Sequence, residues 1–174
     1  MGVDGGIWKV VEVENGNQVY EGTGPIIDYS ETWLLKPGSE WKDYAFESKI
    51  KILKGGLYVC VRRKNFEYTE NDFYNEMDFY NVFSSSDFSV SLGKQIGGNY
   101  EKIGSTGYYL KKDKWYTVRL EVVGQEYRVF IDGELVASYT FDKDSFIEKG
   151  PIGYYIGGGD KVQIDDVKVW TLSK

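Results

Sequence analysis

Histidine is absent from the chain, and cysteine occurs only once, as Cys60. Without histidine, a Ser-His-Asp triad, a Cys-His pair and nearly all catalytic zinc sites are excluded. A single cysteine excludes a disulfide within the chain and leaves the redox compartment open. Because the neighbours of Cys60 alternate as they do in a strand, we expect a packed thiol rather than a reactive one. Any catalysis would have to use carboxylates, Tyr, Lys or Arg.

Long apolar runs and long basic runs are also missing. The apolar runs span only a few residues, whereas a transmembrane helix needs roughly 20, so we expect no membrane insertion. The net charge is −6, with both signs interspersed along the chain and Arg62-Arg63-Lys64 as the nearest approach to a basic stripe. Nucleic acid is therefore not an expected partner, because phosphates require a cluster of Lys and Arg.

Linkers between domains are also lacking. Three prolines are spread over 174 residues. No Ser-, Thr- or Pro-rich tract interrupts the chain, and the sequence contains no internal repeat. This organisation predicts a single domain spanning residues 1–174. The chain begins without the charged and apolar regions of a signal peptide. Either a signal peptide has been removed or the sequence is a piece of a longer protein, and the leader-like Met1-Gly2 favours the second. We therefore expect a piece of a larger multidomain protein, itself monomeric.

What the chain does contain is alternation of apolar and polar residues with a period of two, which predicts β-strands. Turn sequences such as Asn15-Gly16-Asn17, Lys54-Gly55-Gly56 and Asp132-Gly133 separate these segments and suit hairpins. Many short strands joined in this way predict an all-β antiparallel sandwich or barrel with almost no helix. The strands are expected at 8–13, 44–52, 57–62, 76–83, 88–92, 116–123, 127–131, 135–141, 152–156 and 162–170.

The C-terminal half carries a recognisable order of motifs. A strand beginning at Trp115 is followed by two strands around Asp132-Gly133, then by Gly150–Tyr154 and by a closing strand with Asp165-Asp166. This order resembles the concanavalin A-like lectin and glucanase superfamily, including its carbohydrate-binding modules and laminin G-like domains. The resemblance implies a two-sheet antiparallel jelly-roll sandwich. It implies less about function, because this fold hosts lectins, hydrolases, lyases and adhesion domains.

The segment 75–81 is similar to the catalytic strand of family 16 glycoside hydrolases. By that resemblance Glu76 would be the nucleophile and Asp78 its helper, but the acid/base position holds Tyr80 or Asn81. A retaining glycosidase needs two carboxyl groups about 5–5.5 Å apart, and the second is missing here. We therefore predict a non-catalytic domain with no catalytic residue. The alternatives are a hydrolase that uses Glu76, or carboxylates that only line a solvated face.

Aromatic residues make up 17% of the chain, with 15 Tyr and 5 Trp. Flat aromatic rings bind the apolar faces of sugars, although core and edge packing also uses them. Arg62 lies at the end of the strand predicted at 57–62. In the related modules, an arginine at the end of this strand points into the concave groove, where its planar guanidinium can bind hydroxyls. An arginine on an exposed strand rim is the alternative. The predicted sugar-binding residues of the concave sheet are Trp33, Tyr58, Arg62, Glu76, Asp78, Tyr80 and Tyr155.

Asp165 lies where many domains of this group place an aspartate that binds a structural calcium ion. Calcium takes 6–8 oxygen ligands, and Asp4, with Glu12 or Glu14, can supply others. The alternative is that Asp165 bonds a loop backbone. Together these features predict a carbohydrate-binding module that recognises a poly- or oligosaccharide outside the cell or at its surface. A glycoside hydrolase or lyase, or a laminin G-like adhesion or structural domain without a sugar site, are the alternatives.

Overall fold

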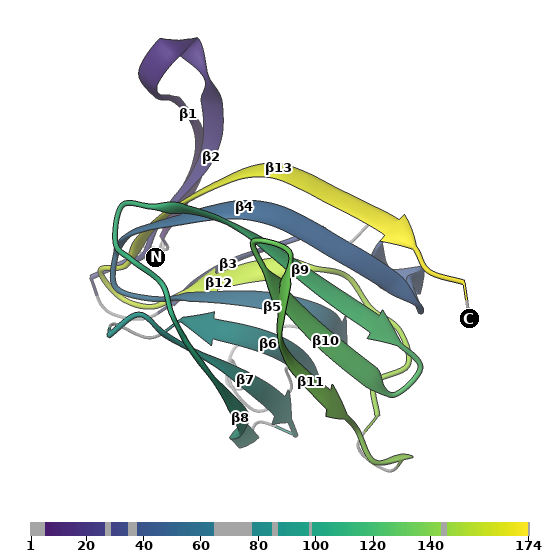
Figure 1. Cartoon of the computed structure of the whole chain (residues 1–174). Coiled ribbons are helices and arrows are strands. Elements are labelled where there is room, and N and C mark those ends of the chain that lie inside the picture. Colours follow the sequence, from purple (N-terminus) through teal and green to yellow (C-terminus); the bar gives the residue numbers. More distant parts are fainter. Residues whose placement is uncertain are drawn as a thin grey trace, which may run out of the picture.

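Two antiparallel sheets pack face to face in the fold, as Figure 1 shows. The computed structural model describes residues 6–26, 29–34, 38–64, 78–84, 87–97, 99–143 and 146–173. Within these ranges the chain forms thirteen strands and two three-residue 3₁₀ turns, η1 (Glu14–Gly16) and η2 (Gly38–Glu40). The prediction of an all-β sandwich with almost no helix is confirmed.

One sheet has seven strands in the order β1-β2-β13-β4-β9-β10-β11. Its N-terminal hairpin stands out from the body of the molecule in Figure 1. The bounds of these strands are β1 (Ile7–Glu12), β2 (Gln18–Thr23), β13 (Lys161–Thr171), β4 (Tyr44–Lys54), β9 (Trp115–Val123), β10 (Glu126–Ile131) and β11 (Glu134–Thr140).

The other sheet has six strands in the order β3-β12-β5-β6-β7-β8. Its bounds are β3 (Ser30–Trp33), β12 (Gly153–Ile156), β5 (Leu57–Lys64), β6 (Asp78–Ser84), β7 (Ser89–Ile96) and β8 (Asn99–Tyr109). Strands far apart in sequence pair here, since β12 inserts between β3 and β5.

The main core lies between the two sheets and follows directly from the alternation. In β9, Tyr116, Val118 and Leu120 are buried while the residues between them are partly exposed. From the other sheet, Val59 and Val61 of β5 join the same cluster. Each such side chain contributes roughly 1.5–3 kcal/mol when it is removed from water. This packing gives β9 a buried face toward the other sheet and a partly exposed outward face.

The predicted strands are found, with shifted ends, and three further strands were missed. These are β2, β3 and β8. Strand β8 is an edge strand whose side chains are exposed or half-buried throughout, so it carries no period-two apolar pattern. Strand β3 is only four residues long. Strand β6 begins at Asp78, and Glu76 lies outside the described residues.

The predicted hairpin at Asp132-Gly133 is present. Ile131 pairs with Glu134, and φ is 50° at Asp132 and 85° at Gly133. Two successive positive φ angles define the type I′ turn that matches the twist of the flanking strands. The Asp132 carboxylate also accepts a hydrogen bond of 2.8 Å from the backbone NH of Thr117.

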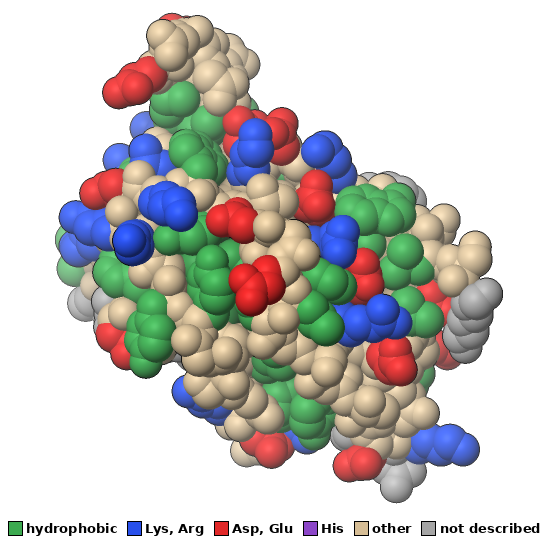
Figure 2. All heavy atoms as spheres, in the orientation of Figure 1, with side chains coloured by type: hydrophobic (Ala, Val, Ile, Leu, Met, Phe, Trp, Pro, Cys, Tyr) green, Lys and Arg blue, Asp and Glu red, His purple; other side chains and the backbone are tan. Residues whose placement is uncertain are grey.

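Charged side chains of both signs are interspersed over the face shown in Figure 2. Across the described part of the chain, no helix has the length and apolar character needed to cross a membrane.

Candidate functional site

The outward face of the six-stranded sheet carries a second, smaller cluster. Cys60 and Tyr155 are buried there with Tyr58 packed against them, apart from the main core. Tyr155 pairs in register with Tyr58 on one side and with Glu31 on the other. Cross-strand partners project to the same face of a sheet, so the structure brings the predicted residues Tyr58 and Tyr155 together on one surface.

Four tyrosines form a row across this face. Tyr58 meets Tyr155 edge-on, with ring centroids 5.1 Å apart, and meets Tyr100 edge-on at 6.2 Å. Tyr29 stacks on Tyr155 with ring centroids 4.8 Å apart. Tyr29 and Tyr100, at the two ends of the row, are exposed. The row therefore offers aromatic surface to solvent at both ends, and Tyr29 and Tyr100 were not among the predicted site residues.

Two phenols of this row, those of Tyr58 and Tyr100, stay neutral under ordinary conditions. Burial raises the pKa of Tyr58, and the neighbouring phenol of Tyr100 adds to the effect. Burial also raises the pKa of Tyr100, to about 12. A neutral phenol both donates and accepts hydrogen bonds, so the row can bond sugar hydroxyls as well as stack on their rings.

A buried ion pair lies next to the tyrosine row. Arg63 Nη1 donates to Glu31 Oε1 at 2.7 Å, and the two side chains are 4% and 10% exposed. Cys60 is fully buried, and its pKa is raised by burial and by the Glu31 carboxylate, while Arg63 acts in the opposite direction. The expectation of a packed, unreactive thiol at Cys60 agrees with this environment.

Arg62 does not reach the predicted groove. Its side chain is 1% exposed, and its guanidinium donates to the carbonyl oxygens of Lys42 (2.6 Å), Gly124 (2.7 Å) and Ile147 (3.1 Å). The Asp43 carboxylate lies 3.4 Å from the same group. The structure thus corrects the prediction: Arg62 ties together three loops at one end of the sandwich.

A β-bulge is the physical reason for this difference. The register between β5 and β6 shifts between Val61 and Lys64, and Arg62 has a φ of 54°. An extra residue in a strand reverses the alternation beyond it. Arg63, not Arg62, therefore follows Cys60 on the outward face. Only an alternation without a bulge would place Arg62 there.

The remaining predicted residues of this sheet are only partly described. Tyr80 pairs with Val61, and Asn81 pairs with Cys60, so position 81 rather than 80 shares the row of Cys60. Asn81 is fully buried, and neither polar atom of its amide has a hydrogen-bond partner. Asp78 pairs with Lys64, and Trp33 pairs with Gly153, but the side chains of positions 33, 78 and 80 lie outside the described part.

Asp165, the predicted calcium ligand, lies on the other sheet. Its carboxylate accepts hydrogen bonds from the backbone NH of Asp166 (2.8 Å) and from the Asn17 amide (3.0 Å). Among the described residues, no group of three or more His, Cys, Asp or Glu side chains gathers around a common point. Asp4 lies outside them. Calcium at Asp165 therefore stays a prediction.

Known structures share this two-sheet jelly-roll fold. The carbohydrate-binding module CBM66 from Bacillus subtilis superposes with a TM-score of 0.71 at 16% identity, over 95% of this chain and 92% of that one. The endo-β-1,4-glucuronan lyase of the fungus Trichoderma reesei superposes with a TM-score of 0.61 at 10% identity, over 96% of this chain and 87% of the lyase. The Caenorhabditis elegans galectin LEC-6 superposes with a TM-score of 0.57 at 13% identity, over 86% of this chain and 95% of the galectin.

A family model decides the assignment. Residues 3–170 match the 3-keto-alpha-glucoside-1,2-lyase-like domain, so the chain belongs to this family. No curated protein matches the sequence. The resemblance to the concanavalin A-like superfamily, stated from the motifs, is confirmed.

Proposed function

We propose that the domain binds carbohydrate on the outward face of its six-stranded sheet and does not catalyse a reaction there. The observation that carries this proposal is the row of Tyr29, Tyr155, Tyr58 and Tyr100. Aromatic surface of this kind stacks on the apolar face of a sugar ring, while neutral phenols bond its hydroxyls.

The buried pair of Arg63 and Glu31 supports the same proposal. A guanidinium presents a planar fork of donors that matches vicinal hydroxyls, and the carboxylate orients it at 2.7 Å. The similarity of the fold to the carbohydrate-binding module CBM66 supplies further support. We extend the proposal to a poly- or oligosaccharide ligand and to a location outside the cell or at its surface, as part of a larger protein.

Binding should depend on Tyr58, inside the tyrosine row, and on Tyr100, at its exposed end. Affinity electrophoresis against a panel of β-glucans, galactans, fructans and xylans identifies the ligand. With that glycan, Tyr58→Ala and Tyr100→Ala should each weaken binding by about tenfold, because an aromatic contact adds roughly 0.5–1.5 kcal/mol beyond its buried area. Tyr109→Ala is the matched control, because Tyr109 also lies on β8 but is exposed outside the row.

The tyrosine-row proposal is wrong if the three variants bind equally well. It is also wrong if none of the glycans retards the unchanged protein, an outcome that would favour a laminin G-like adhesion or structural domain.

The family match favours a second candidate, an elimination reaction on a 3-keto-glucoside. Such a reaction needs a base beside the ketone. Burial raises the pKa values of Tyr58, Tyr100 and Cys60, so these groups stay protonated near neutral pH and are poor bases there. The other candidate base on the described part of this face, the Glu31 carboxylate, is paired with Arg63 at 2.7 Å. Together these environments support the non-catalytic proposal.

The domain should therefore release no glucose from 3-keto-trehalose, a 3-keto-α-glucoside, during prolonged incubation, as followed by a coupled glucose assay. Polysaccharides of the panel should likewise yield no new reducing ends. Release of glucose that disappears in Glu31→Gln would instead place the protein among the lyases. Hydrolysis that disappears in Glu76→Gln would place it among the glycoside hydrolases.

A further inference from the structure

A pocket of about 460 Å³ lies on the outward face of the seven-stranded sheet, beneath the turn of the β1–β2 hairpin. This volume is within the range of roughly 300–1,000 Å³ that is common for small-molecule sites. The pocket lies on the sheet opposite the tyrosine row. Its polar and aromatic lining residues are Glu14, Asn15, Asn17, Lys51, Trp115 and Gln163.

Three neighbouring strands form the floor. Lys51 of β4 pairs in register with Trp115 of β9 on one side and with Gln163 of β13 on the other. Their side chains consequently project side by side from the same face. The Lys51 ammonium lies 5.9 Å from the centroid of the Trp115 ring, so a ligand at the ring is within reach of this donor.

Gln163 is held in one orientation. Its Nε2 donates to Glu21 Oε2 at 2.9 Å. Burial alone would raise the pKa of Glu21, but the hydrogen bonds from Gln163 and Lys161 outweigh it and lower the pKa. A charged carboxylate accepts hydrogen bonds only, so Glu21 takes the amide NH₂. The other polar atom of that amide is its carbonyl oxygen, an acceptor on a residue that lines the pocket.

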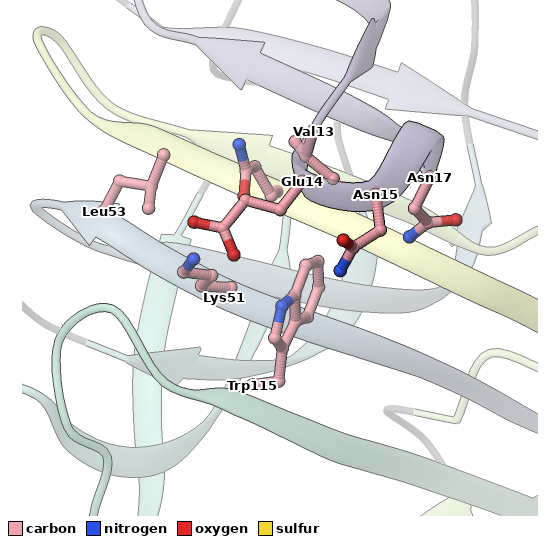
Figure 3. A pocket seen from close by; sticks show the side chains of 8 residues that line it. Val13, Glu14, Asn15, Asn17, Lys51, Leu53 and Trp115 are labelled. Atoms are coloured by element: carbon pink, nitrogen blue, oxygen red, sulfur yellow. The ribbon is translucent and has the colours of Figure 1, made fainter.

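The hairpin turn forms the roof and is fixed above the floor. The Val13 NH donates to the Asn17 carbonyl oxygen at 2.7 Å, and positive φ at Asn15 (64°) and Gly16 (74°) closes the turn. Asn17 Nδ2 donates to Asp165 Oδ2 at 3.0 Å and so ties the turn to β13. Figure 3 shows Glu14 and Asn15 directed from the turn toward Lys51 and Trp115.

We propose that this pocket is a second saccharide-binding site, specific for a neutral mono- or disaccharide and independent of the tyrosine row. Trp115 supplies an aromatic surface for the apolar face of a pyranose. Glu14 accepts, Lys51 donates, and the amide of Asn15 does both, as a ring of hydroxyls requires. One carboxylate and one ammonium balance each other, which favours an uncharged sugar. The fixed turn reduces the entropy lost on binding.

The test uses NMR spectra of the ¹⁵N-labelled protein with cellobiose, maltose, lactose and xylobiose, and with digalacturonate as a charged comparison. Each sugar is added to about 10 mM, enough to detect dissociation constants near 1 mM. The indole NH signal of Trp115 is assigned by its loss in Trp115→Ala. It should shift with at least one neutral disaccharide and not with digalacturonate.

Variants then locate the binding. Trp115→Ala, followed by the backbone amide signals of the turn, and Glu14→Gln, followed by the Trp115 signal, should each weaken binding by about fivefold or more. Glu14 is exposed on a turn, so Glu14→Gln should leave the stability of the fold almost unchanged. Trp170→Ala is the matched control, an exposed tryptophan near the other end of β13. Both Trp170→Ala and Tyr58→Ala should leave the Trp115 shift unchanged.

Three outcomes would overturn the second site. The first is that the Trp115 signal moves with no neutral disaccharide. The second is that digalacturonate moves the signal at least as far as the neutral disaccharides do. The third is that the shift disappears in Tyr58→Ala. The last result would assign all sugar binding to the tyrosine row and would leave the proposed function intact.

Discussion

Arg62→Ala should lower the free energy of unfolding by about 3–5 kcal/mol, the range found when one partner of a buried charged network is removed. The guanidinium satisfies carbonyl oxygens of Lys42, Gly124 and Ile147, and alanine would leave all three without this donor. For a domain of this size, the loss corresponds to a decrease of roughly 6–20 °C in Tm. Thermal and urea unfolding followed by circular dichroism measure it.

Arg128→Ala is the matched control for that result. Arg128 is 41% exposed and pairs with Glu126 at 2.9 Å on the surface. Exposed ion pairs contribute about 1 kcal/mol or less, so this variant should unfold close to the unchanged protein. A contrary result would be an Arg62→Ala variant that is as stable as Arg128→Ala but no longer binds the glycan. Arg62 would then contact sugar in the groove, as an uninterrupted alternation predicts.

Arg63→Met should both destabilise the domain and abolish glycan binding. The substitution leaves the Glu31 carboxylate, which is 10% exposed, without the guanidinium 2.7 Å away. We expect a loss of about 3 kcal/mol, since a carboxylate with little solvent access has lost its charged partner. Adding Glu31→Leu should recover most of the stability, because replacing both members of a buried pair with apolar residues is often neutral.

The double variant separates a structural role of this pair from a binding role. If Arg63 contacts sugar, Arg63→Met with Glu31→Leu should regain stability but remain unable to bind the glycan in affinity electrophoresis. Recovery of stability and binding together would show that the pair only supports the sheet. The tyrosine row would then carry the proposed site alone. The free energies of the single and double variants also give the coupling between the two residues.

Much of the fold follows from local patterns. The alternation through Tyr116, Val118 and Leu120 predicts which face of β9 is buried, because side chains of a strand point to opposite faces in turn. Asp132-Gly133 predicts a type I′ hairpin because both residues tolerate positive φ. The same local reasoning placed Tyr58 and Tyr155 on strands and called for an all-β sandwich. It missed β8, an edge strand whose exposed side chains need no apolar period.

The composition of the candidate sites depended on long-range pairing. The insertion of β12 between β3 and β5 brings Tyr155 beside Tyr58 and Glu31, and no local pattern encodes that neighbourhood. The Lys51, Trp115 and Gln163 floor likewise joins three strands that are distant in sequence. In the sequence, Trp115 indicates only the start of a strand typical of the fold. Its role in a pocket could not be predicted, because nothing near it in the chain indicates its neighbours across the sheet.

The sequence by itself thus determined the fold class, the inward face of most strands, the tight turns and the absence of histidine chemistry. Tertiary structure alone decided which of two adjacent arginines faces the tyrosine row. A bulge after Val61, with φ of 54° at Arg62, turns one guanidinium toward loop carbonyls and leaves Arg63 to pair with Glu31. The carbonyl oxygens that bind Arg62 come from three loops far from it in sequence. These oxygens need a hydrogen-bond donor from the protein only after the sheets have packed and water has been excluded.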